Sequence, residues 1–190
     1  MKAIILASSS KQRSDIFKRA HIPFTVEESG YEEDMTLTLA PHELVQHLAE
    51  GKARAVAVRH PDALIIGADT VVACDGKVFG KPSTPQEGRE MLKILSGKTH
   101  TVLTGFVVID SETGKKISRT VATDVRFKAL SDEDIDSYIA DGEFSGKAGG
   151  YAIQGSGSRF VERIQGDMDN VIGLPLQALL EELAKFGIAV

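Results

Sequence analysis

The sequence predicts an α/β protein built on a mixed β-sheet. Strand-like and helix-like segments alternate along the chain, and residues 64–73 are apolar on both faces, which is typical of a central strand. Two long β-type runs, at 99–109 and 117–127, flank a turn at 111–114. Because strands joined through helices tend to run parallel and strands joined by tight turns run antiparallel, both kinds of pairing are expected in one sheet.

The first half of the chain is expected to alternate strands with helices. Ser10 is suited to cap the first helix, and Pro41 suits the first turn of the second. Val45, Leu48 and Val56 recur on one face of that second helix, as in an amphipathic helix packed on a core. The predicted strands are 2–7, 24–28 and 64–73, and the predicted helices are 11–20 and 41–60.

The second half contains equally clear start and stop signals. Asp75 and Gly76 form a hairpin-turn signal. Thr84, followed by a proline and three residues later by a glutamate, indicates a capped helix start, and Gly142 and Gly187 suit helix ends. The predicted helices are 85–95, 131–142 and 176–186, and the predicted strands are 99–109, 117–127 and 159–164.

Size and charge indicate one acidic domain spanning residues 1–190, with two lobes. The 190 residues carry a net charge of −5, from 22 Lys and Arg against 27 Asp and Glu, which argues against nucleic-acid or acidic-membrane binding. The single cysteine, Cys74, excludes an internal disulfide and fits a reducing compartment. The apolar stretch before Ser8 is too short for a signal peptide, and no run approaches the roughly 18 apolar residues of a membrane span, so a cytoplasmic protein is expected.

Asp69 and Lys52 are the charged residues that depart most from their apolar surroundings. Asp69 interrupts the strand 64–73, where a carboxylate is costly unless it meets a metal, a cation or several donors. The alternative is an acid at a strand end that is hydrogen-bonded to backbone. Lys52 lies four residues after Leu48, so it either serves a site or extends along the edge of the core. Both are therefore candidate site residues.

Three further segments carry groups suited to phosphate or metal. Residues 8–13 join a strand to a helix start, where backbone N–H groups, serines and two cations favour anions. Glu32 and Glu33 offer carboxylates for magnesium, and Lys81, between a glycine and a proline, offers a phosphate contact. Each segment also has a purely structural alternative. The serines could only cap the helix, the two glutamates could lie in a solvated loop, and Lys81 could lie in a surface turn.

Taken in order, these segments resemble the Maf family of nucleoside triphosphate pyrophosphatases. The similarity runs over nearly the whole chain, from residues 6–10 to 173–175. The segments that carry it are Ser8 to Arg13, Glu33, Lys52-Ala53, Gly67-Ala68-Asp69-Thr70, Gly80-Lys81-Pro82, Ser96-Gly97, Thr104-Gly105, Lys147-Ala148-Gly149 and Tyr151-Ala152-Ile153-Gln154-Gly155. The resemblance implies an elongated, twisted mixed sheet with flanking helices and a cleft between two lobes, related to the inosine triphosphate pyrophosphatases.

The resemblance also implies a reaction and the residues that perform it. A nucleoside triphosphate of pyrimidine type, such as dTTP or UTP, would be hydrolysed at the α-phosphorus to the monophosphate and pyrophosphate, with Mg²⁺ or Mn²⁺ as cofactor. A homodimer is expected by the same analogy. Asp69 matches the catalytic acid, and Glu33 and Asp69 are the expected metal ligands. The expected phosphate-binding residues are Ser8, Arg13, Lys52 and Lys81, and the expected base-specificity residues are Gln12, Thr70 and Gln154.

One pair of residues departs from the family pattern. Gln12 stands where the family usually has an arginine, and Lys11 stands where it usually has a proline. Arg13 and Lys11 remain for phosphate binding, so the departure bears on base choice. The competing hypothesis is a nucleotide-binding regulator of cell division and septum formation with little turnover.

Glycine is more frequent than usual, and the excess is concentrated in one segment. Six of the 18 glycines lie within residues 142–157, together with Lys147 and Gln154. Glycine lets backbone approach a ligand closely, and an amide side chain can read a base edge. We therefore expect this loop to pass close to the nucleotide, with valine at Gly149 or Gly155 harming activity more than folding; a flexible connector is the alternative.

Overall fold

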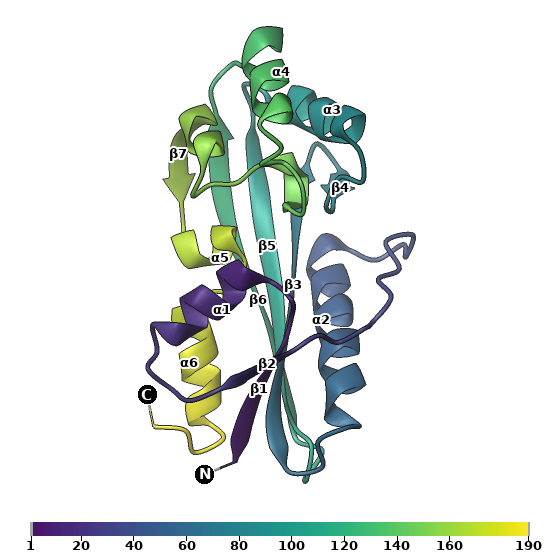
Figure 1. The fold of residues 1–190 in the computed structure, drawn as a ribbon, viewed down its shortest axis with the longest axis vertical. Helices are drawn as coiled ribbons and strands as arrows, with labels where there is room; N and C mark the ends of the chain where they lie inside the picture. Colours follow the sequence, from purple (N-terminus) through teal and green to yellow (C-terminus); the bar gives the residue numbers. More distant parts are fainter. Residues whose placement is uncertain (1, 190) are drawn as a thin grey trace. The chain divides into compact units, whose positions relative to one another are not determined.

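The computed structural model describes residues 2–189, which divide into two compact units (Figure 1). Unit 1 takes the chain up to Asp69, residues 104–121 and the chain from Gly173 onward, and unit 2 takes residues 70–103 and 122–172. Three of the four boundaries between the units fall inside long strands, so each of these strands contributes to both units.

A seven-stranded mixed sheet forms the framework. Its strands are β1 (Ala3–Ala7), β2 (Thr25–Glu27), β3 (Ala63–Cys74), β4 (Lys77–Phe79), β5 (Thr99–Asp110), β6 (Lys116–Phe127) and β7 (Val161–Gln165). The strand order is β2-β1-β3-β5-β6-β7, with β4 paired to β3. β2 and β3 run parallel to β1, whereas β4 is antiparallel to β3 and β7 is antiparallel to β6. The mixed α/β fold predicted from the sequence is therefore confirmed.

Unit 1 places helices on both faces of its part of the sheet (Figure 1). The helices are α1 (Lys11–Lys18), α2 (Pro41–Ala57) and α6 (Leu176–Ala184). α2 covers one face, where Ile5 and Ile65 pack with Ala49 and Ala53. Because successive strand residues point to opposite faces, the buried Leu6 faces the side covered by α1 and α6. The sheet of unit 1 is thus buried on both faces, as a parallel arrangement requires.

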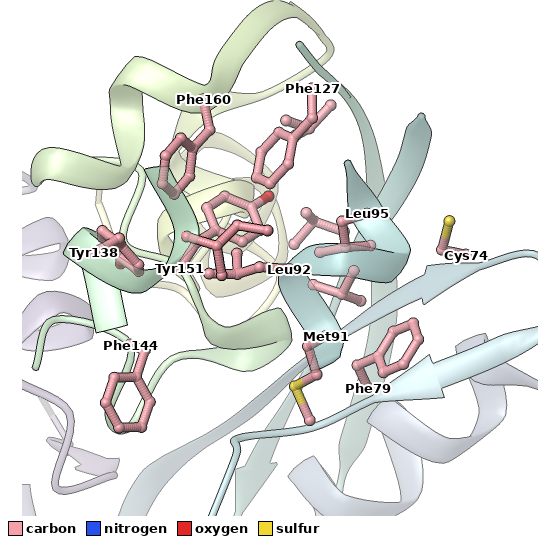
Figure 2. Packing of buried hydrophobic residues seen from close by; sticks show 14 residues of the cluster. Cys74, Phe79, Met91, Leu92, Leu95, Phe127, Tyr138, Phe144, Tyr151 and Phe160 are labelled. Carbon is pink, nitrogen blue, oxygen red and sulfur yellow. The ribbon is translucent and has the colours of Figure 1, made fainter. Parts of the chain in front are cut away.

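Unit 2 is built around a cluster of aromatic side chains (Figure 2). Its helices are α3 (Pro85–Leu95), α4 (Asp132–Ala140), the short 3₁₀ helices Ala148–Gly150 and Ser156–Phe160, and α5 (Met168–Ile172). The Phe127 ring lies 4.8 Å from that of Tyr151 and 6.0 Å from that of Phe160, and Tyr138 lies 5.1 Å from Phe160, all centroid to centroid and close to edge-on. Such tilted contacts are favourable for aromatic pairs.

All predicted helices and strands are present in the structure, but one of them is wrong in part and unit 2 contains further elements. The predicted strand at 159–164 was wrong in its first part, because residues 156–160 form a 3₁₀ helix that turns the Phe160 ring into the aromatic cluster and β7 begins only at Val161. The short strand β4, the 3₁₀ helix Ala148–Gly150 and the short helix α5 are not among the predicted elements. Several other elements are shorter than expected, with α1 ending at Lys18, α2 at Ala57 and α6 at Ala184. None of the helices in residues 2–189 is both long enough and apolar enough to cross a membrane.

Gly149 and Gly155, where valine was expected to harm activity more than folding, differ in their surroundings. Gly149 has a φ of +69°, and a Cβ there would lie 2.8 Å from Cγ2 of Val72 on β3. A Cβ on Gly155 would overlap the carboxylate of Glu143, since it would lie 2.9 Å from the Cδ atom. Valine at Gly149 would therefore damage the fold, which contradicts the expectation for that position. At Gly155 the end of the Glu143 side chain can move away, so the expectation for that position stays a prediction.

His100 packs against the buried core of unit 2. It is 1% exposed, its Nε2 lies 2.8 Å from the hydroxyl of Tyr151, and its ring meets Phe127 edge-on at 4.7 Å. Burial lowers the pKa of His100 to about 4, because the protonated ring would lose its hydration.

We predict that His100 makes the fold less stable in acid. The unfolded chain takes up a proton at His100 near pH 6.5, whereas the folded chain does so only near pH 4, so stability falls as pH drops through this window. Between pH 7.5 and 5 the loss from this group is about 2 kcal/mol. Urea unfolding of wild type and His100→Gln at both pH values measures it. Equal losses in the two proteins would contradict the assignment, because glutamine cannot titrate.

Candidate functional site

Five of the residues singled out in the sequence come together in unit 1. They come from five segments: Ser8 follows β1, Arg13 lies in α1, Glu33 in the irregular stretch 28–40, Lys52 in α2 and Asp69 in β3. Four of them are buried, with exposed fractions of 5% for Ser8, 7% for Arg13, 6% for Lys52 and 4% for Asp69. Buried charges are stable only when they are paired, so these side chains must meet partners.

The turn from β1 into α1 fixes Ser8 and Arg13. Ser10 caps the helix, with its Oγ accepting the N–H of Arg13 at 3.4 Å, while the Ser8 Oγ accepts the N–H of Ser10 at 3.2 Å. The Arg13 guanidinium donates from Nε to the carbonyl of Gly173 at 2.8 Å and from Nη1 to the Ser8 Oγ at 3.5 Å. A planar guanidinium held at two of its nitrogens has a defined orientation.

Lys52 joins two carboxylates that come from different parts of the chain. Its Nζ donates to Oδ1 of Asp69 at 2.5 Å and lies 2.7 Å from Oε1 of Glu33. The side chains of Lys52 and Asp69 are 8% and 6% exposed, whereas that of Glu33 is 33% exposed. The two carboxylates therefore converge on one ammonium group, with Glu33 on the solvent side.

Arg13 shares the same electrostatic environment. Burial lowers the pKa of Arg13, and the negative charges of Asp69 and Glu33 oppose that shift. The guanidinium stays charged at any physiological pH. Two cations, Arg13 and Lys52, thus face two carboxylates, Asp69 and Glu33.

Glycine at position 67 allows α2 to approach β3 closely enough for this contact. A Cβ on Gly67 would overlap the carbonyl oxygen of Ala49 and lie 2.9 Å from the backbone nitrogen of Ala53, both in α2. Residues two apart on a strand share a face, so Asp69 points toward the same helix as Gly67. The Gly67-Ala68-Asp69 sequence therefore sets both the spacing of the helix and the direction of the carboxylate.

The remaining predicted site residues are Gln12, Thr70, Lys81 and Gln154. Gln12 contributes to the cap of α1, where its Oε1 accepts the Ser10 hydroxyl at 3.3 Å. Thr70 follows Asp69 on β3 and is half-buried, and by strand alternation it points to the opposite face of the sheet. Lys81 and Gln154 are exposed residues of unit 2.

Within unit 2, the segments that carry Lys81 and Gln154 contact each other. The N–H of Gly149 donates to the carbonyl of Gly80 at 3.0 Å. A Cβ on Gly150 would lie 3.7 Å from Cγ of Pro82, so this glycine also packs on the Gly-Lys-Pro turn. The glycine-rich segment is therefore attached to this turn and is not a free connector.

Sequence reasoning missed Gly173 as a partner of the site. Its carbonyl accepts the Nε–H of Arg13, and its φ of +127° is one that glycine adopts far more readily than other residues. Nothing in the Gly-Leu-Pro sequence at residues 173–175 pointed to an arginine 160 positions earlier.

Glu33 and Asp69 are the residues suited to hold a divalent cation. In residues 2–189 no group of three or more His, Cys, Asp or Glu side chains is placed to bind a metal by itself. Mg²⁺ is commonly held by one or two carboxylates together with substrate phosphates. The convergence of these two carboxylates on Lys52 fits a cation of that kind, bound jointly with a phosphate ligand.

Comparisons with known proteins found a matching family model, similar sequences and a similar solved structure. A family model described as "Maf-like protein" matches residues 3–186. A dTTP/UTP pyrophosphatase of Bacillus mycoides (strain KBAB4) is 45% identical over 186 residues, covering 98% of this chain and 96% of the relative. A dTTP/UTP pyrophosphatase of Moorella thermoacetica is 44% identical over 190 residues, covering 100% of this chain and 98% of the relative. The solved structure of a HAM1 protein from Coxiella burnetii shares the fold, with a TM-score of 0.51 at 14% identity over 97% of this chain and 100% of that one.

We predict that Lys52 stabilises the fold mainly by neutralising Asp69. Lys52→Met leaves a buried carboxylate without its cation, which should cost about 3 kcal/mol in the free energy of unfolding. The double variant Lys52→Met/Asp69→Asn should recover most of this loss, because the amide carries no charge. Urea denaturation at pH 7.5 measures both. A double variant no more stable than the single one would contradict the ion-pair account.

Proposed function

Because the chain belongs to the Maf family, we propose that it is a nucleoside triphosphate pyrophosphatase. In this reaction, water attacks the α-phosphorus and the bond between the α-phosphorus and the bridging oxygen breaks, which releases a nucleoside monophosphate and pyrophosphate. The observation that carries the proposal is the buried Asp69 carboxylate, held by Lys52 beside Arg13. The high identity to two relatives named dTTP/UTP pyrophosphatase supports it.

Asp69 is the group best placed to act on the attacking water. It is 4% exposed, and its Oδ1 is fixed by Lys52. A carboxylate fixed through one oxygen can use the other to orient a water molecule and accept its proton. We assign this role to Asp69.

The triphosphate would be bound by groups that already point into the cluster. Ser8, Arg13 and the capped start of α1 supply a hydroxyl, a guanidinium and backbone N–H groups, which are the donors that phosphate oxygens accept. Lys52 adds an ammonium, and Lys81 of unit 2 is proposed to contribute a further cation. Preorganised donors of this kind stabilise the charge that develops as pyrophosphate leaves.

Glu33 and Asp69 are the proposed ligands of a divalent cation, Mg²⁺ or Mn²⁺. When bound, such a cation neutralises charge on the leaving pyrophosphate. The support from the structure is the convergence of the two carboxylates on a single positive charge.

The proposed substrate is a pyrimidine nucleoside triphosphate, dTTP or UTP, and the proposed enzyme is a cytoplasmic homodimer. Gln12, Thr70 and Gln154 are the proposed base-specificity residues. The competing hypothesis of a nucleotide-binding regulator without turnover does not explain why a carboxylate is buried beside cations suited to phosphate, because binding alone does not require it.

Asp69→Asn is expected to separate catalysis from binding. The amide cannot accept the proton of water, so kcat for pyrophosphate release from dTTP or UTP should fall by about 10²- to 10⁴-fold. Nucleotide affinity measured without a divalent cation should change little. Asp62→Asn, at a residue whose side chain is 73% exposed, is the matched control and should keep wild-type turnover.

Two results would overturn the proposed function. Wild-type turnover in Asp69→Asn would remove Asp69 from the mechanism. Nucleotide binding by the wild-type protein with no pyrophosphate release from any member of a nucleotide panel would favour the regulator hypothesis.

Gln154→Ala is expected to change base preference without changing stability. Gln154 is exposed, so its loss should alter the free energy of unfolding by less than about 0.5 kcal/mol. If Gln154 reads a base edge, the ratio of kcat/KM for dTTP to that for dATP should fall by about tenfold. Steady-state kinetics with both nucleotides measure the ratio, and an unchanged ratio would remove Gln154 from base selection.

A further inference from the structure

Glu33 is the one residue of this cluster that lies on a long irregular segment of the chain. Residues 28–40 contain neither helix nor strand, and the Glu33 side chain is 33% exposed, compared with 8% for Lys52 and 6% for Asp69. An exposed carboxylate on irregular backbone forms a well-defined contact only if a neighbouring residue is anchored. Another residue of this segment must therefore hold it against α2.

Tyr31 provides such an anchor by packing on Gly51 of α2. A Cβ on Gly51 would overlap the end of the Tyr31 ring, lying 2.5 Å from Cε2 and 2.7 Å from Cε1. The ring therefore occupies the space that a side chain at position 51 would need. Tyr31 is half-buried, and its N–H donates to Oγ of Ser29 at 3.3 Å, which further restricts the backbone here.

The contact between Tyr31 and Gly51 lies next to the ion pair between Glu33 and Lys52 along both segments of the chain. Gly51 and Lys52 are neighbours in α2, and Tyr31 and Glu33 are two residues apart in the segment that faces it. Seating the Tyr31 ring on Gly51 therefore holds this part of the segment against the turn of α2 that carries Lys52, whose Nζ lies 2.7 Å from Oε1 of Glu33.

We propose that Tyr31 is a positioning residue for Glu33, and that glycine at position 51 is required because the Tyr31 ring packs there. The expected effect of Tyr31 on kcat rests on the proposed function. The expected ordering of residues 28–40 by Tyr31 does not depend on it.

Gly51→Ala is the sharpest test, because it should leave the fold intact. The atoms that the new methyl group would meet belong to the far end of a side chain, which can move away. Alanine is also a better helix former than glycine, so the thermal midpoint Tm should stay the same or rise. Any loss of activity can then be attributed to the displaced ring and not to unfolding.

The kinetic arm compares Gly51→Ala and Tyr31→Ala with Tyr31→Phe, which keeps the ring. Both alanine variants should lower kcat for pyrophosphate release by about tenfold, with a smaller change in KM for the nucleotide, because Glu33 is misplaced while Ser8 and Arg13 are not. Tyr31→Phe should retain wild-type kcat. Met35→Ala, at an exposed position of the same segment, is the control for unspecific effects.

A double-variant cycle identifies Glu33 as the residue through which Tyr31 acts. In a Glu33→Gln background, Tyr31→Ala should lower kcat no further, because the group that it positions is already gone. Additive losses would overturn the proposal, and so would a Gly51→Ala protein with wild-type kcat.

Hydrogen–deuterium exchange tests the contact without any turnover. Exchange in residues 28–40 should be faster in Gly51→Ala and Tyr31→Ala than in wild type or Tyr31→Phe, while exchange in β3 stays the same. Unchanged exchange in residues 28–40 would overturn the proposal even if the wild-type protein is active. A wild-type protein without pyrophosphate release, but with faster exchange in the variants, would instead overturn only the proposed function.

Discussion

The site depends on the two ion pairs made by the Lys52 ammonium group. It lies inside unit 1, bonded to Asp69 and Glu33, so the helix, the strand and the irregular segment that carry these residues meet at one nitrogen atom. A buried carboxylate is very costly without a cation, and a buried ammonium is costly without carboxylates. Each partner therefore explains why the other can be buried, and the ion pair with Asp69 persists only while α2 stays close to β3.

That distance is set by small residues, and glycine serves different purposes along the chain. Gly67 and Gly105 let α2 lie against the sheet, since a Cβ at Gly105 would come within 2.6 Å of the Val45 carbonyl carbon. Gly51 leaves room for an aromatic ring that directs Glu33. Gly149 packs against Val72 in the core of unit 2. Other glycines, such as Gly76 and Gly114, have a positive φ with open space around them, so turns contribute to the glycine excess as well as close packing.

Much of the fold and part of the site can be predicted from the sequence, for identifiable reasons. Capping residues and hydrophobic periodicity locate α1, α2 and α3, because these signals are local. Asp69 stands out because a charge in an apolar strand needs a partner. The 3₁₀ helix that ends at Phe160 was missed, because its conformation is decided by a ring that packs on residues distant in the chain. The same limit applies to Gly173 and to the contact between Tyr31 and Gly51, which join segments that no local pattern relates.

In the proposed mechanism, water acted on by Asp69 attacks the α-phosphorus of a nucleoside triphosphate. Hydrolysis of dTTP in ¹⁸O-labelled water, followed by mass spectrometry of both products, tests it most directly. The mechanism predicts one ¹⁸O atom in the nucleoside monophosphate and none in pyrophosphate, because the attacking oxygen stays on the phosphorus that it reaches. Label in pyrophosphate, or release of labelled orthophosphate in place of pyrophosphate, would place the attack at another phosphorus and contradict the account.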